Sequence, residues 1–193
     1  MLTEIGVLLV SQGIQIRMAN TKSAAQLGYK QVQDESANLL RPFGFKRKGS
    51  TLFKREGDIF GLLQFQSGPS STRTEISFTI NFGVIIASLE NEYRYNQIAK
   101  YPSSVHLHVH RRVGQDTWWS ITNETDLPAF NKYFSDLVLS DVLPFVEKYM
   151  NIENVLGMWE DGESIGLTEG QRLRYLGKLR KLLEKGKNVR DIG

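Results

Sequence analysis

Residues 75–84 alternate between apolar and polar side chains, and this run constrains the fold more than any other part of the chain. The apolar positions are Ile76, Phe78, Ile80, Phe82 and Val84, and the polar or small positions are Glu75, Ser77, Thr79, Asn81 and Gly83. Successive side chains of a β-strand point to opposite faces of the sheet. The run therefore predicts a strand with one buried face and one exposed face.

Similar alternation elsewhere predicts an antiparallel sheet. Residues 51–56 and 58–67 are strand-like and are joined by a tight turn at Gly57, which predicts a hairpin. Alternation returns over 105–113, and we expect 118–122 to be its hairpin partner.

Along the chain, helices are predicted before and after these strands. Apolar residues recur at helical spacing over 23–43 and in the segment that follows Asp126, which is its predicted N-cap. They recur again over 169–185, where Thr168 and Gln171 form a predicted capping pair. This order differs from the regular strand–helix alternation of parallel sheets. We expect an α+β fold with an antiparallel sheet of four to six strands and helices packed on one face. The residues expected to point toward the helices are Ile76, Phe78, Ile80, Phe82, Leu107 and Val109.

The length of 193 residues suits one domain, which we place at 21–193 and expect to end in a basic amphipathic helix. We expect residues 1–20 to be an N-terminal extension outside this domain, because Met18 opens a polar stretch that reads like a natural start. The apolar run 5–10 is shorter than the roughly 20 residues of a membrane span. Glu4 stands where a signal peptide has basic residues.

Composition narrows the class of protein. The chain has no cysteine, which excludes thiol catalysis and disulfides and fits a reducing compartment, so we expect a cytoplasmic protein. The formal net charge is +3, and basic residues gather at both ends of the chain. The middle of the chain is acidic, so the sequence does not predict one continuous basic footprint for nucleic acid. We expect a soluble protein that is not bound to a membrane.

Several short segments resemble a known bacterial family. They are Gly44–Arg55, Gln64–Ser67, Phe78–Val84, Arg112–Gly114, Trp118–Trp119 and Leu143–Phe145. In order and spacing they are similar to domain of unknown function 4304, over roughly residues 27–156. The resemblance implies membership of a family without an assigned activity, and it implies neither a metal nor a cofactor.

The three histidines of the chain lie at 106, 108 and 110, within the strand predicted over 105–113. On a strand, His106, His108, His110 and Arg112 would form one polar row, with about 6.6 Å between successive members. The same sheet face would carry Gln64, Gln66 and Asn81. Amides, imidazoles and a guanidinium make directional hydrogen bonds, so we take these seven residues as candidate ligand-binding residues.

Two alternatives stay open beside this binding surface. The histidine row could bind zinc in a metal-assisted hydrolase, although three histidines in a line do not close a tetrahedral site alone. The cations of 46–55 and of the last helix could bind nucleic acid, or simply protect a sheet edge and cover a solvated helix face. No nucleophile elbow, phosphate-binding loop or dinucleotide fingerprint is present in the sequence. We therefore expect a non-catalytic module that binds a protein or a polar small molecule, without cofactor, metal or nucleic acid.

Overall fold

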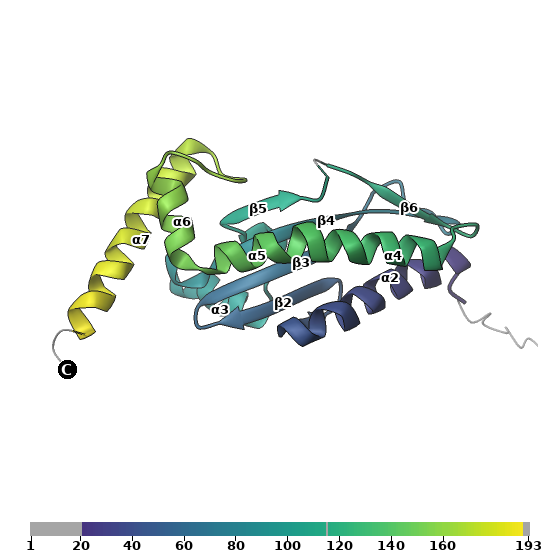
Figure 1. The fold of residues 1–193 in the computed structure, drawn as a ribbon, viewed down its shortest axis with the longest axis horizontal. Helices are drawn as coiled ribbons and strands as arrows, with labels where there is room; N and C mark the ends of the chain where they lie inside the picture. The colour runs from purple at the N-terminus through teal and green to yellow at the C-terminus, as the bar shows by residue number, and fades with distance from the viewer. Residues whose placement is uncertain (1–20, 115, 191–193) are drawn as a thin grey trace, which may run out of the picture.

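The computed structural model describes residues 21–114 and 116–190. The predicted extension, residues 1–20, lies outside the described residues. Six strands form one antiparallel sheet in the order β1-β2-β3-β4-β5, with β6 also paired to β4, and this confirms the α+β fold (Figure 1). The strands are β1 (Lys46–Lys48), β2 (Thr51–Glu56), β3 (Ile59–Ser67), β4 (Glu75–Ile86), β5 (Val109–Arg112) and β6 (Trp119–Thr122).

Six helices surround the sheet within the described residues. They are α2 (Ala24–Leu40), α3 (Glu92–Lys100), α4 (Leu127–Leu137), α5 (Leu143–Met150), α6 (Ile152–Glu160) and α7 (Glu169–Arg190). In this part of the chain no helix combines the length and the apolar character that crossing a membrane requires. The predicted caps are present: the Asp126 carboxylate accepts from Ala129 N, and Thr168 and Gln171 cap α7 reciprocally.

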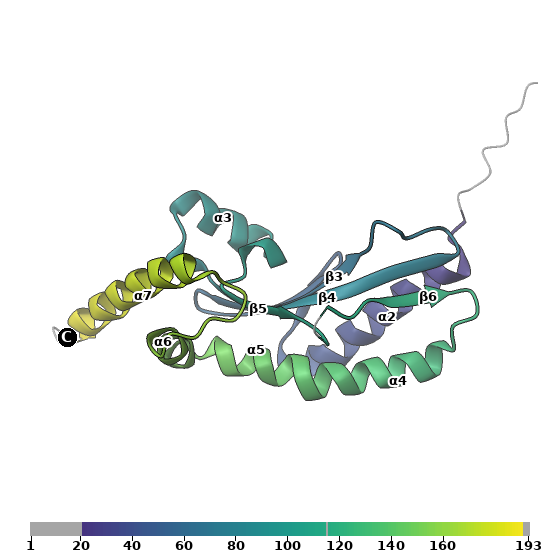
Figure 2. The same ribbon diagram turned by 90° about the horizontal axis from the view of Figure 1, so that it is seen from above.

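The main core lies between one face of the sheet and helices α2, α4 and α5 (Figure 2). Phe78 is fully buried there. The centroid of its ring lies 5.9 Å from that of Phe65, 6.0 Å from that of Phe134 and 5.6 Å from that of Trp119. The even-numbered residues of β4 from Phe78 to Ile86 belong to this core, as the alternation predicts, and Ile76 is also buried. A methyl group on Gly61 would lie 2.5 Å from a Val146 methyl carbon, so α5 seats directly on β3 where there is no side chain.

Helix α3 packs on the opposite face, over one end of the sheet (Figure 2). A second apolar cluster forms there from Phe60, Leu62, Ile85, Ala87, Ile98 and Leu107. The prediction that Leu107 points toward the main core is therefore wrong, because Leu107 precedes β5 and packs under α3. The rest of this face carries Gln64, Gln66 and Asn81.

Strands β5 and β6 lie end to end along one edge of β4, and the predicted hairpin between them is wrong. Asn81 of β4 pairs with Arg112 of β5, whereas Phe78 of β4 pairs with Trp119 of β6. Both strands run antiparallel to β4, so the chain does not reverse between them. The backbone groups of β4 therefore have hydrogen-bond partners on this edge both at residues 75–78 and at residues 81–84. If β5 and β6 paired only with each other, these groups of β4 would be left unpaired.

The backbone of β5 approaches β4 closely at Gly83. Its φ is 154°, and a methyl group there would lie 1.9 Å from the carbonyl oxygen of Val109. A side chain would have to push β5 away from β4. The small residue at this position is thus required by the pairing that brings His110 and Arg112 onto the sheet.

We expect Phe78→Ala to lower the free energy of unfolding by about 3–5 kcal/mol, because it removes a fully buried ring from the main core. A denaturant titration measures the loss, with Tyr133→Ala on α4 as the control, since Tyr133 is 53% exposed. A loss below about 1 kcal/mol for Phe78→Ala would contradict this description of the core.

Candidate functional site

A hydrogen-bonded row of polar side chains crosses three strands on the sheet face away from α2, α4 and α5. Asn81 Nδ2 donates to Gln66 Oε1 at 2.7 Å, and Arg112 Nε donates to Asn81 Oδ1 at 3.0 Å. Arg112 also pairs with Asp116 at 2.8 Å. We call Gln64, Gln66, Asn81 and Arg112 the polar sheet face. The three members of the row come from β3, β4 and β5, as the sequence predicted.

Gln64 has a different environment at the border of this face. Its side-chain oxygen accepts a hydrogen bond from the backbone N–H of Ser104 at 2.8 Å, in the turn that leads to the histidines. Gln64 is half-buried and holds this turn against the sheet, whereas Gln66 is exposed. Of the two predicted glutamines, Gln66 is thus the one available to a ligand.

An exposed aromatic ring adjoins the polar row. Trp118 is 41% exposed, and the Arg112 guanidinium lies 5.9 Å from its ring centroid. The neighbouring Trp119 packs into the main core against Phe78 and Phe134. The pair of tryptophans therefore places one indole on each side of the sheet, as expected from a strand.

The predicted row of three histidines does not form. His106 belongs to a 3-10 turn (Ser104–His106), and only His110 lies in β5. The alternation of 105–113 fails in its first half because Leu107 packs under α3 and the chain enters the sheet only at Val109. Within the part of the chain that the structure describes, no three His, Asp or Glu side chains come close enough to share a metal ion.

His108 is buried and uses both ring nitrogens. Its Nδ1 accepts from the backbone N–H of Ile86 at 3.1 Å, so the ring proton lies on Nε2, which donates to Glu90 Oε1 at 3.1 Å. Tyr175 Oη donates to the same carboxylate oxygen at 2.8 Å. We call Glu90, His108 and Tyr175 the buried triad.

The two outer histidines are shielded in different places. His110 donates its backbone N–H to the Ile165 carbonyl at 3.1 Å, and Gly166 lies against its ring. Burial, and secondarily the Arg112 charge, lowers the pKa of His110. Burial also lowers the pKa of His106, and the nearby Arg94 adds to that effect. Both imidazoles therefore favour the neutral form.

The hydrogen bond from His108 holds the Glu90 carboxyl in its ionised form. Together with the bond from Tyr175, it lowers the pKa of Glu90 to about 2 in spite of burial. Burial, with the bond to Glu90, raises the pKa of the Tyr175 hydroxyl. The triad thus fixes one negative charge on the partly buried Glu90.

Sequence reasoning missed Glu90 and Tyr175, which lie 85 positions apart in the chain. Glu90 sits beside a short turn and Tyr175 in the middle of a basic helix, so neither belongs to a motif. Arg172, one of the cations of the last helix that would cover a solvated face, is buried. Its guanidinium binds Glu169 and the Trp159 carbonyl oxygen.

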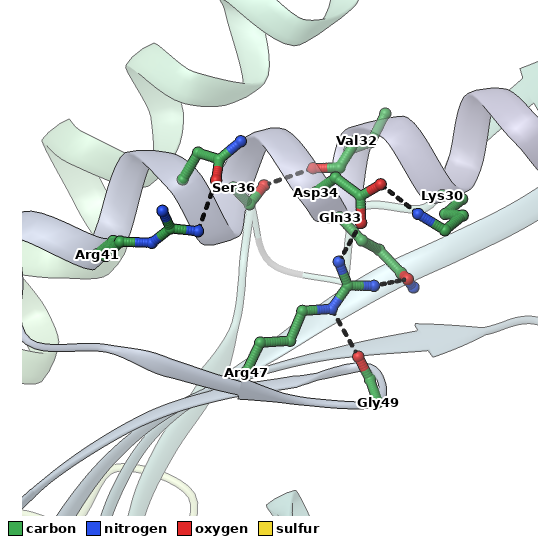
Figure 3. A network of polar contacts seen from close by, with 9 residues as sticks. Lys30, Val32, Gln33, Asp34, Ser36, Arg41, Arg47 and Gly49 are labelled. Carbon is green, nitrogen blue, oxygen red and sulfur yellow. Dashed lines mark hydrogen bonds and ion pairs between the residues drawn. The ribbon is translucent and has the colours of Figure 1, made fainter.

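The cations of the hairpin region are largely paired within the protein. Arg47 binds Asp34 and Gln33 of α2 and the Gly49 carbonyl, while Lys30 binds the same Asp34 (Figure 3). Lys54 lies 3.5 Å from Glu147 and 3.6 Å from Glu56. These contacts favour the structural reading of this basic cluster over a phosphate-binding one.

The family model described as Domain of unknown function (DUF4304) matches residues 36–148. That region contains the polar sheet face and two members of the buried triad, but not α7 with Tyr175. No curated protein matches the chain, and no solved structure does.

We expect the stability of the protein to fall in acid through Glu90. A carboxyl whose pKa is about 2 when folded, below its ordinary 4.5, stabilises the fold above pH 4.5 and loses that contribution as the pH falls toward 2. Between these pH values the wild type should lose on the order of 2 kcal/mol more than Glu90→Gln. Urea titrations across this pH range test it, with Glu124→Gln at an exposed position as the control. Equal pH dependence of wild type and Glu90→Gln would contradict it.

Proposed function

The chain belongs to the family described as Domain of unknown function (DUF4304), and we propose that it is a non-catalytic binding module of the bacterial cytoplasm that recognises a segment of another protein. The polar sheet face is the proposed contact surface. The observation that carries the proposal is the row Gln66–Asn81–Arg112, which lies beside the exposed ring of Trp118.

The chemistry of this surface supports a protein ligand. The row fixes its amides and guanidinium in place by mutual hydrogen bonds, so little side-chain freedom is lost when a partner binds. Tryptophan and arginine are enriched among the residues that contribute most to protein interfaces. Arg112 and Trp118 lie together here, at 5.9 Å between guanidinium carbon and ring centroid.

The metal-assisted hydrolase is the less favoured alternative. It requires the three imidazoles to converge, whereas both nitrogens of His108 already have protein partners. His106 and His110 contact different parts of the fold, one in a 3-10 turn and the other beside Gly166. The hairpin cations, paired with Asp34 and Glu147, likewise give no specific support to nucleic-acid binding.

A photo-crosslinking amino acid at Ser120 tests the proposed function. Ser120 is exposed and pairs with Ser77, on the same sheet face as the polar row. We expect the crosslinker at position 120 to capture a specific partner. The same crosslinker at position 133, on α4 at the other face of the sheet, should not capture that partner. With that partner purified, Arg112→Ala and Trp118→Ala should each weaken binding by about tenfold or more, and Tyr133→Ala should not. Equal crosslinking from both positions, or unchanged affinity in both surface variants, would contradict the proposal.

We expect no stoichiometric metal in protein purified without an affinity tag, because the nitrogens of His108 are occupied by protein partners. Elemental analysis measures the zinc and nickel content. About one metal per chain, lost in His108→Ala, would overturn the non-catalytic proposal and favour the hydrolase.

A further inference from the structure

A polar cavity of about 460 Å³ lies between the start of α3, the 3-10 turn at His106 and the face of α7. No residue of the polar sheet face lines it, whereas Glu90 and Tyr175 of the buried triad do. Its charged lining residues are Glu90, Arg94, Arg174 and Lys178. We propose that this α3–α7 pocket binds the phosphate group of a small phosphate monoester.

The charges of the pocket leave an unbalanced positive site. Glu90 is the single carboxylate of the lining, and it already accepts from Tyr175 and His108 and lies 3.7 Å from Arg94. Arg174 and Lys178 form no ion pair among the residues whose side chains the structure describes. Two cations therefore stay uncompensated, and a phosphate monoester carries about −1.5 to −2 charges at pH 7.

These two cations are held at the cavity wall by the same aromatic ring. Arg174 lies 4.7 Å and Lys178 5.5 Å from the ring centroid of Tyr175, whose hydroxyl is fixed on Glu90. Lys178 donates one hydrogen bond to the Leu89 carbonyl oxygen at 2.6 Å, which leaves two of its ammonium donors for a ligand. Like charges four positions apart destabilise a helix, and a bound anion removes that cost.

The remaining lining suits the rest of such a ligand. His106 borders the cavity, and its buried Nδ1 has no hydrogen-bond partner among the described residues. Asn91 and Gln171 add amide groups. The volume lies within the range of small-molecule sites and exceeds the space that a phosphate alone needs, so a short polar group such as a glycerol or sugar fits beside it.

Calorimetric titration with glycerol 3-phosphate tests the proposal. We expect saturable binding with a Kd of about 1 mM or tighter, weakened roughly tenfold in Arg174→Gln and in Lys178→Gln. Arg174 is exposed, so its variant tests the site even where Lys178→Gln, which loses the bond to Leu89, fails to fold. Arg180→Gln is the matched control, because Arg180 lies on the same helix but pairs with Glu160. Its affinity should stay within about twofold of the wild type.

Three results would overturn the proposal. The first is no saturable binding at ligand concentrations up to about 10 mM. The second is an equal loss in Arg180→Gln and Arg174→Gln, which would indicate a general effect of charge. The third is micromolar binding of a DNA duplex at physiological salt that Arg174→Gln weakens, because the helix face would then be a nucleic-acid surface.

Discussion

Strand β4 is hydrogen-bonded along both of its edges, and this pairing positions the main core and the polar sheet face. One edge joins β3 over nine residue pairs, while the other holds β5 and β6 in succession. Its even-numbered side chains from Phe78 to Ile86 build the core under the helices, and Asn81 on its other face links Gln66 to Arg112. Its last residue, Ile86, donates the backbone hydrogen bond that fixes the tautomer of His108.

The buried triad illustrates how a charge is kept inside a protein. Removing a carboxylate from water is costly unless hydrogen bonds replace those lost. Glu90 receives two such bonds on one oxygen, from a histidine next to β5 and a tyrosine of α7. The triad therefore ties the C-terminal helix to the sheet by a polar contact, beside the apolar contacts of Leu176 and Leu179.

Patterns within short segments of the sequence predicted the strands and helix ends that depend on neighbouring residues. Alternation located β4 and the hairpin of β2 and β3, and the Thr168–Gln171 pair located the start of α7. Partners that lie far apart in the chain could not be found in this way. Alternation over 105–113 resembles a full strand, yet pairing with β4 begins only at Val109. Glu90 and Tyr175 meet through the tertiary fold alone, so no spacing in the sequence identifies them.

The hydrogen bond between His110 N–H and the Ile165 carbonyl also bears on how copies of the protein meet one another. A strand edge with free backbone groups is a template on which another chain can add a strand and begin to aggregate. The segment before α7 occupies this position at β5. At the opposite margin β1 is only three residues long, and all three are basic. The β1 margin and the β5 part of the opposite margin are thus poor templates for the addition of another strand, which disfavours edge-to-edge assembly of copies there.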